Sequence, residues 1–247
     1  MKTILITGAT AGFGEAAARK FVGGGWRAIG TGRRGDRLRK LQQDLGDAFL
    51  PLEIDMLDRA AVESLAKLDA QWGEIDLLLN NAGLAPPTDS LSETEWERIE
   101  QVIDTNVTGL VALTRALLPK LVERKGQIIN LSSVAATYPY KGGAVYGGTK
   151  AFVRQFSLDL RSDLAGTGVR VTSVEPGMAE TEFTIVRTGG DKEASDKLYA
   201  GMKPMTSDDL ADLFWWLANL PPHLNINTVE LMPVSQSFAG FTVTRET

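Results

Sequence analysis

Three side chains in this sequence stand at a spacing that suits proton transfer. Ser133, Tyr146 and Lys150 form the pattern Ser-x12-Tyr-x3-Lys. A tyrosine and a lysine four positions apart share one face of a helix, where the ammonium favours the ionised phenolate and lowers the tyrosine pKa toward the range of a general acid or base. A serine on a preceding strand could hydrogen-bond the same substrate oxygen. The set therefore predicts an acid–base site for a carbonyl or a hydroxyl group.

A glycine-rich turn near the amino terminus supplies the second part of the chemistry. Glycines 8, 12 and 14 follow an apolar run and precede an alanine-rich stretch. In that context a tight turn lets backbone N–H groups and a helix amino terminus meet a pyrophosphate, although such a turn can also serve backbone geometry alone. With the acid–base set, it predicts a nicotinamide-dependent oxidoreductase. The expected cradle comprises Gly8, Thr10, Ala11, Gly12, Phe13 and Gly14.

The next apolar run ends in a sequence that bears on the choice of cofactor. It reads Gly30-Thr31-Gly32-Arg33-Arg34, and no acid follows until Asp36. An NAD enzyme would usually place an acid there for the ribose 2′-hydroxyl, whereas two arginines suit a 2′-phosphate. Cations at a helix amino terminus oppose the macrodipole, so a bound anion explains them better than a solvated helix start does. Arg33 and Arg34 therefore favour NADP(H).

Composition narrows the class of protein. The 247 residues are 43% hydrophobic, enough for one large α/β domain over residues 1–247. The 26 basic residues are scattered among 31 acidic ones, so no basic stripe suits nucleic acid. Apolar runs fall short of the roughly 20 residues that a membrane span needs. Cysteine is absent, which excludes disulfides and thiol catalysis and leaves the cytoplasm as the expected location, and the single histidine, His223, has no companion ligands for a metal.

Short apolar runs alternate with amphipathic stretches along the chain. This alternation predicts an α/β fold, a doubly wound Rossmann domain with a seven-stranded, mostly parallel sheet and helices on both faces. The polar segment 178–203 is long for a connection and is interpreted as a lid over the site, with a disordered surface loop as the alternative. Strands are expected at 3–7, 28–31, 49–54, 75–79, 127–131, 169–174 and 228–232, and helices at 14–23, 34–45, 59–71, 93–123, 145–165 and 207–220.

The ordered motifs resemble those of the short-chain dehydrogenase/reductase family along nearly the whole chain. They are the glycine turn, Asn80-Asn81-Ala82-Gly83, Asn106, the Ser-Tyr-Lys set and Pro176-Gly177. The resemblance implies that Tyr146 exchanges the proton, that Lys150 lowers its pKa and holds the nicotinamide ribose, and that Ser133 orients the substrate oxygen. Ser132 could face the site instead, but the thirteen-residue offset favours Ser133. Asn106 would hold a water that links Lys150 to solvent, or would merely bridge backbone groups within its helix.

The same resemblance extends the cofactor site. Asp55 and Met56 match the position that brackets adenine, although Asp55 could instead cap the next helix. Asn81, Ala82 and Gly83 match the wall beside the ribose and nicotinamide. The stretch 176–181 matches the segment that passes over the nicotinamide, where Pro176 and Gly177 lie and Thr181 could reach the carboxamide.

A closer likeness is to the NADP-dependent 3-hydroxy acid dehydrogenases, and it implies a short anionic substrate. The expected reaction is reversible, NADPH-dependent reduction of a semialdehyde to its hydroxy acid, of the malonic semialdehyde or serine type. Arg187 in the lid and Gln236 near the carboxyl end are the candidate substrate ligands, with a solvated arginine and an ordinary surface glutamine as the alternatives. The same groups would suit a sulfonate, so sulfoacetaldehyde reductase, which forms isethionate, is the alternative enzyme. Tyr138 and Tyr140 could line the pocket or pack beneath a loop.

The sequence also bears on a functional alternative and on the oligomeric state. A non-catalytic protein that senses NADP is a functional alternative, disfavoured by the intact acid–base set. The family is commonly tetrameric, so a homo-oligomer is expected, and the apolar tail 238–243 could join its contacts. Trp215 and Trp216 are adjacent on the last predicted helix, so at most one of them can face the core comfortably.

Overall fold

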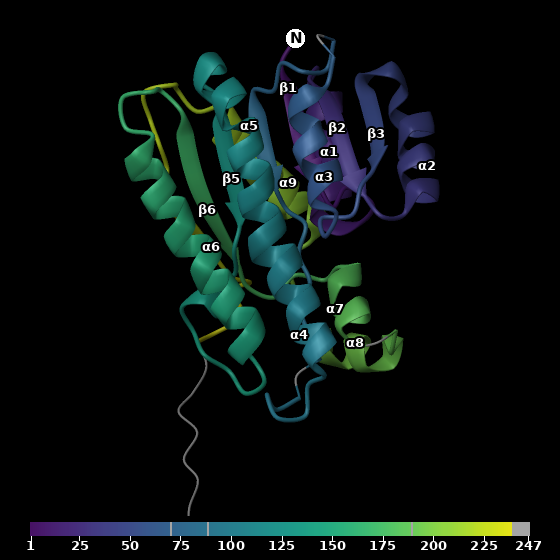
Figure 1. Cartoon of the computed structure of the whole chain (residues 1–247). Helices are drawn as coiled ribbons and strands as arrows, with labels where there is room; N and C mark the ends of the chain where they lie inside the picture. The colour runs from purple at the N-terminus through teal and green to yellow at the C-terminus, as the bar shows by residue number, and fades with distance from the viewer. Residues whose placement is uncertain (70, 88, 189, 239–247) are drawn as a thin grey trace, which may run out of the picture.

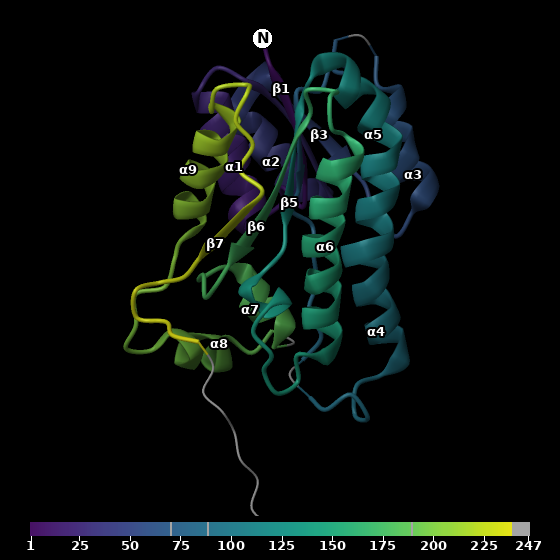
Figure 2. The same cartoon turned by 90° about the vertical axis from the view of Figure 1, so that its left-hand side faces the viewer.

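The computed structural model describes residues 1–69, 71–87, 89–188 and 190–238. Its centre is a single sheet of seven strands, and helices cover both faces (Figure 1). Figure 2 shows the two layers from the side, with α1, α2 and α9 on one face of the sheet and α3, α5 and α6 on the other. The predicted α/β architecture is confirmed, and every strand pair is parallel rather than most of them.

The strand order indicates where a ligand is expected to bind. It is β3-β2-β1-β4-β5-β6-β7, so the chain winds outward in both directions from β1 and β4. In such sheets ligands bind beyond the carboxyl ends of the strands, at the point where the order reverses. The strands are β1 (Thr3–Thr7), β2 (Arg27–Gly32), β3 (Phe49–Glu53), β4 (Leu77–Asn80), β5 (Gln127–Leu131), β6 (Arg170–Pro176) and β7 (Thr228–Leu231).

Alternate residues of the buried strands supply two cores. Ile4 and Ile6 of β1 pack on one side, and Leu5 packs on the other. The covering helices are α1 (Gly12–Gly23), α2 (Gly35–Leu45), α3 (Arg59–Ser64), α5 (Leu110–Arg124), α6 (Ala144–Asp163) and α9 (Ser207–Ala218). Because both faces of the central strands are buried, their middles are apolar runs, such as Ile4–Ile6 of β1 and Leu77–Leu79 of β4.

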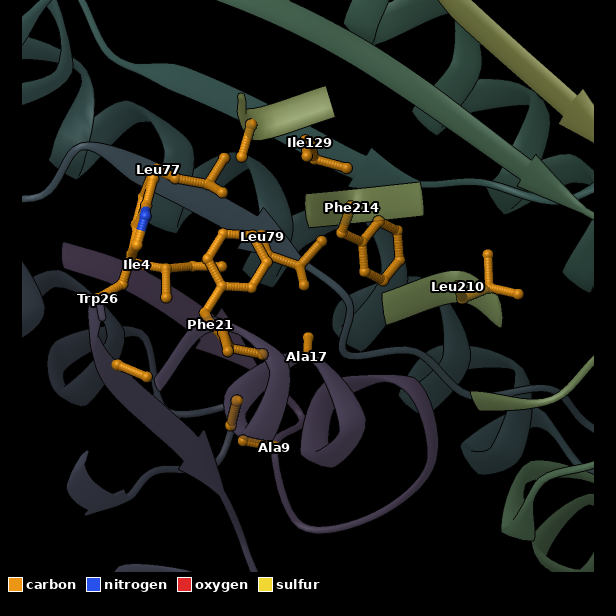
Figure 3. Close-up of a cluster of buried hydrophobic side chains, with 14 of the residues drawn as sticks. Ile4, Ala9, Ala17, Phe21, Trp26, Leu77, Leu79, Ile129, Leu210 and Phe214 are labelled. Carbon is orange, nitrogen blue, oxygen red and sulfur yellow. The ribbon is translucent and has the colours of Figure 1, made fainter. Parts of the chain in front are cut away.

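The core beneath α1 and α9 is built around aromatic rings. Figure 3 shows Phe21 of α1 and Phe214 of α9 pointing toward β1 and β4. Trp215 lies edge-on to Phe21 with ring centroids 5.3 Å apart, while its neighbour Trp216 is 51% exposed. The expectation that only one of the adjacent tryptophans faces the core is confirmed.

Two predicted segments differ from the structure. The expected helix 93–123 is divided into α4 (Trp96–Ile103), a π-helical turn (Asp104–Gly109) and α5. The segment 178–203, which has no element in the prediction, contains the short helices α7 (Glu182–Arg187) and α8 (Lys192–Tyr199), beyond the carboxyl ends of the strands (Figure 1). Both α7 and α8 begin at a side-chain cap, Thr181 and Asp191 respectively, which stabilises helices too short to rely on propensity.

One further predicted helix is shorter in the structure. The helix predicted at 59–71 ends earlier, as α3 followed by a 3-10 turn (Leu65–Lys67). Most of the tail 238–243 lies outside the described residues, which end at Phe238. Within the described ranges, no helix is long and apolar enough to cross a membrane.

Candidate active site

The glycine turn follows the carboxyl end of β1 and packs against the segment after β4. Gly8 has φ +72°, a left-handed conformation that favours glycine, and a Cβ on Gly14 would overlap the Gly8 carbonyl oxygen. Asn81, just after β4, donates from its side-chain amide to the carbonyl oxygens of Thr7 at 2.8 Å and Gly8 at 3.2 Å. The Asn81 amide therefore fixes the turn against the 81–83 segment, and it packs too closely on Gly8 and Gly14 to leave room for larger side chains there.

The serine that faces the site is Ser133. Ser132 is buried and donates to the carbonyl oxygen of Lys150 at 2.8 Å, which directs its hydroxyl into the packing of α6. Ser133 caps the 3-10 turn Val134–Ala136, and its hydroxyl also lies 3.4 Å from the carbonyl oxygen of Pro176 at the end of β6. The structure thus brings Ser133, and not Ser132, to the phenol of Tyr146.

Tyr146 and Lys150 lie on the same face of α6, as their spacing predicts. Burial raises the pKa of Tyr146 to about 12, and the nearby Ser133 hydroxyl and Arg187 guanidinium oppose this rise. Lys150 has its Nζ 5.6 Å from the centre of the Tyr146 ring and donates to the carbonyl oxygen of Leu131 at 2.7 Å. Burial lowers the pKa of Lys150 to about 8. The expected lowering of the tyrosine pKa by Lys150 is therefore not seen here, because the cations and donors that act on the phenol are Arg187 and Ser133.

Asn106 lies in the π-helical turn, and its amide is held on both sides. It accepts from the N–H of Leu84 at 2.8 Å and donates to the carbonyl oxygen of Leu84 at 2.8 Å and to Thr149 at 3.0 Å. The amide thus bridges backbone groups of the loop after β4 rather than of its own helix, which corrects that alternative. Its oxygen and Lys150 Nζ both lie 3.4 Å from the place that a Cβ on Gly83 would occupy. A π-turn inside a helix is frequently found at functional sites.

Arg187, at the end of α7, lies over the acid–base set. Its guanidinium carbon is 5.7 Å from the centre of the Tyr146 ring, and it donates to the hydroxyl of Tyr140 at 3.0 Å and to the carbonyl oxygen of Pro86 at 3.2 Å. The ring of Phe183, on the same helix, packs on the ring of Tyr146 with centroids 5.9 Å apart. The segment 178–203 thus places a cation beside the phenol, and the alternative of a solvated loop arginine is wrong.

The three arginines that follow β2 make different contacts. Arg33 is exposed, and no described residue forms a hydrogen bond or ion pair with it. Arg34 donates to Thr10 in the glycine turn at 2.8 and 3.1 Å and to Glu182 at 2.9 Å. Arg37, which belongs to no sequence motif named above, pairs with the same carboxylate at 2.6 Å. Three cations therefore gather where β2 meets α2.

Comparison with known protein families agrees with this arrangement. The model of the short chain dehydrogenase family matches residues 2–190. The chain belongs to this family. It is therefore an oxidoreductase, as the Ser-Tyr-Lys set and the glycine turn predicted.

Individual relatives of this dehydrogenase are close. It is 59% identical over 245 residues to serine 3-dehydrogenase of Agrobacterium fabrum, covering 99% of this chain and 98% of the relative. It is 54% identical to the NADP-dependent 3-hydroxy acid dehydrogenase YdfG of Salmonella typhi, covering 98% and 99%. A solved structure described as the closed form of serine dehydrogenase complexed with NADP+ superimposes with a TM-score of 0.96 at 51% identity, covering 99% of this chain and 100% of that one.

The remaining candidate residues of the cofactor site contact neighbouring parts of the fold. Asp55 accepts from the N–H of Leu57 at 3.0 Å, and the cap of α3 is Asp58, so the capping alternative for Asp55 is wrong. Met56 is buried against Gly109 of the π-turn. Thr181 caps α7 and lies against Gly12 of the glycine turn.

Gln236 contacts the backbone rather than standing alone at the surface. Its side-chain oxygen accepts from the N–H of Met178 at 2.7 Å and lies over Gly177. The side chain therefore holds the stretch after β6 in place.

Sequence reasoning missed Glu182 and Arg37, because an ion pair between residues 145 positions apart leaves no local pattern.

Proposed function

We propose that this dehydrogenase uses NADP(H) to interconvert a short 3-hydroxy acid and its semialdehyde. The observation that carries the proposal is the position of Arg187, whose cation lies 5.7 Å from the ring of the proposed acid–base residue Tyr146. A carboxylate bound to that guanidinium would place a carbonyl or hydroxyl one or two carbons away near the phenol. The names of the relatives, serine 3-dehydrogenase and 3-hydroxy acid dehydrogenase, support the same substrate class.

The residues present fit a dinucleotide phosphate. The crevice between β1 and β4 has a glycine turn that side chains would fill, and Arg33 is an exposed cation with no partner among the described residues. Gly8 to Gly14 would hold the pyrophosphate, and Arg33 and Arg34 the 2′-phosphate. Asp55, Met56, Asn81, Ala82, Gly83, Pro176, Gly177 and Thr181 would complete the cofactor site. When bound, the nicotinamide supplies or accepts the hydride.

The chain's own residues would manage the proton and the substrate. Tyr146 donates its phenolic proton to the carbonyl oxygen in reduction and removes it from the hydroxyl in oxidation. Ser133 hydrogen-bonds the same oxygen, and Lys150, 4% exposed, holds the nicotinamide ribose. Arg187 has one guanidinium nitrogen, Nη1, that no described residue hydrogen-bonds, so it can bind the acid group of the substrate while Tyr140 and Pro86 keep it in place. Asn106 and Gln236 position neighbouring segments.

A sulfonate is the second candidate acid group, because it presents oxygens to the same guanidinium. Reduction of sulfoacetaldehyde to isethionate would use the same proton and hydride steps. The two acids differ in size and geometry, so discrimination depends on where α7 places Arg187 to within about an ångström. The carboxylate is preferred because both named relatives act on, or are named for, carboxylic hydroxy acids.

The test compares NADPH oxidation with malonic semialdehyde and sulfoacetaldehyde side by side, with NADH as the second cofactor. We expect NADPH to be preferred and malonic semialdehyde to give the larger kcat/KM. A large preference for sulfoacetaldehyde would assign the enzyme to sulfonates, and turnover of neither would contradict the small-anion proposal. A protein that only senses NADP would bind the cofactor without turnover, and Tyr146→Phe would leave its behaviour unchanged.

We also propose a homo-oligomer, with a tetramer as the first candidate. Large apolar side chains stay exposed on two neighbouring helices, with Trp96 of α4 64% exposed and Phe152 of α6 41% exposed. A second copy of the chain could cover them. The lack of cysteine suits the reducing cytoplasm, where we expect the enzyme to act.

A further inference from the structure

One carboxylate ties helix α7 to the opposite side of the cofactor crevice. Glu182, the first residue of α7, accepts from Arg34 at 2.9 Å and from Arg37 at 2.6 and 2.8 Å. The arginines belong to the corner between β2 and α2, and Arg34 also holds Thr10 in the glycine turn. These ion pairs therefore extend from the lid segment across to the turn that would hold the pyrophosphate.

We propose that Glu182 is a positioning residue that fastens α7 across the crevice and thereby keeps Arg187 over Tyr146. The inference rests on the proposed function, since it assigns Arg187 to the substrate. Glu182 and Arg187 are the two ends of a six-residue helix, so they are separated by only about 8 Å along its axis. A helix this short moves as one body, so the Glu182 contact at its first residue, together with the Thr184–Tyr199 bond, restricts where its last residue lies.

The rest of the lid segment is anchored at its base. Ala179 and Met205 form a parallel bridge, which joins the two ends of the segment. Tyr199 of α8 donates to the carbonyl oxygen of Ala179 at 2.8 Å and bonds Thr184 of α7 at 2.6 Å. The segment is thus bound together internally, and Glu182 provides a contact that joins it to α2.

A 2′-phosphate and Glu182 can be served by these arginines together. Arg37 uses one nitrogen, Nη1, for both oxygens of Glu182, and no described residue hydrogen-bonds its other two. Arg33 is exposed and without a described partner. Enough donors therefore remain for a phosphate without loss of the ion pairs, which favours a contact that closes with the cofactor over one that competes with it. The likeness to a closed structure complexed with NADP+ points the same way.

The strength of the contact suits a lid that must open. The side chains of Arg34, Arg37 and Glu182 are 41%, 40% and 44% exposed. Ion pairs at such exposure contribute little to global stability and are screened by salt. They are still strong enough to shift an open–closed equilibrium several-fold, and weak enough to break in each catalytic cycle.

The experiment measures the rate of NADPH release from its complex with wild type, Glu182→Gln, Arg37→Gln and the double variant, at low and high salt. Glu193→Gln is the matched control, because Glu193 is a lid carboxylate that pairs only with Lys197 of its own helix among the described residues. Hydrogen exchange of the α7 amides is followed in the same proteins without added cofactor. The thermal unfolding midpoint of each variant is recorded as a check of folding.

We expect Glu182→Gln and Arg37→Gln each to speed NADPH release about two- to tenfold, and the double variant to do little more than either. Salt should speed release from wild type more than from Glu182→Gln, α7 exchange should rise in Glu182→Gln, and Glu193→Gln should behave as wild type. Slower release from Glu182→Gln would overturn the inference and show competition with the phosphate. Equal rates of NADPH release and equal α7 exchange in Glu182→Gln and Glu193→Gln would overturn it as well. If wild type fails to prefer NADPH over NADH, the cofactor assignment fails, and the exchange of α7 still decides the role of Glu182.

Discussion

The guanidinium carbon of Arg187 lies 5.7 Å from the ring centroid of Tyr146, so the cation that ends α7 faces the phenol at the start of α6. Burial alone would hold the proton on that phenol, and Arg187 opposes this effect. One side chain therefore has two consequences. It makes the tyrosine easier to ionise, and in the proposed function it would bind the acid group of the substrate.

Tyr146→Phe should lower kcat about 10²- to 10⁴-fold, because a phenyl ring has no proton to exchange. NADPH affinity should change by no more than a few-fold, measured by fluorescence titration. Tyr138→Phe is the matched control, since the Tyr138 hydroxyl donates to Glu230 at 3.1 Å, and its kcat should stay close to that of wild type. An active Tyr146→Phe would assign proton transfer to another group.

Arg187→Gln should reduce kcat/KM for an anionic substrate about 10- to 100-fold, through loss of a charge-assisted hydrogen bond. A neutral aldehyde of similar size should lose much less. The variant should also move the pH profile. Without the cation the tyrosine pKa rises, so oxidation, which needs the phenolate, should require a higher pH. Equal losses for neutral and anionic substrates would remove Arg187 from acid binding.

Lys150→Met should abolish oxidoreduction yet raise the free energy of unfolding at neutral pH. Burial lowers the pKa of Lys150 from 10.5 to about 8 in the folded protein, so below pH 8 folding must bury a charge. The unfolded chain binds the extra proton between about pH 8 and 10.5, so stability from this group rises with pH over that window. The gain from methionine, on the order of 1–3 kcal/mol, should be full below pH 8 and vanish above 10.5. Denaturant unfolding at pH 7 and pH 10 tests this, with exposed Lys40→Met as the control.

Gly14→Ala should weaken NADPH binding and destabilise the fold by about 1–3 kcal/mol, because the added Cβ would overlap the Gly8 carbonyl oxygen. Gly23→Ala, at the end of the same helix, is the control. Nothing lies within 4 Å of a Cβ there, so it should be neutral or slightly stabilising. Cofactor titration and thermal unfolding of both variants decide the point. Normal NADPH affinity in Gly14→Ala would contradict the role of the turn.

Local sequence patterns predicted several strands and the helical face that Tyr146 and Lys150 share. Strands such as Thr3–Thr7 and Gln127–Leu131 were placed by their apolar runs, and Tyr146 and Lys150 by helical spacing. The π-turn at Asp104–Gly109 could not be predicted, because it depends on the contacts that Asn106 makes with Leu84 and Thr149. The short helices α7 and α8 have six and eight residues, which is too short for a helical period to stand out in the sequence.

Contacts between distant segments set the limit for the site itself. Arg33 and Arg34 stand out in the sequence, but no local pattern connects Arg34 with Glu182, since that contact exists only after α7 folds against α2. The pKa of Tyr146 was expected to fall beside Lys150. It rises instead because burial outweighs the nearby donors, and burial is a property of the folded site rather than of residue spacing.

The most direct test of the proposed chemistry is the initial rate of NADP+ reduction with L-serine and with 3-hydroxypropionate, measured for wild type and Tyr146→Phe and repeated with NAD+. We expect saturable NADPH formation with at least one of these acids, a clear preference for NADP+ over NAD+, and near-complete loss in Tyr146→Phe. Absence of NADPH formation with either acid, or equal rates in wild type and Tyr146→Phe, would contradict it.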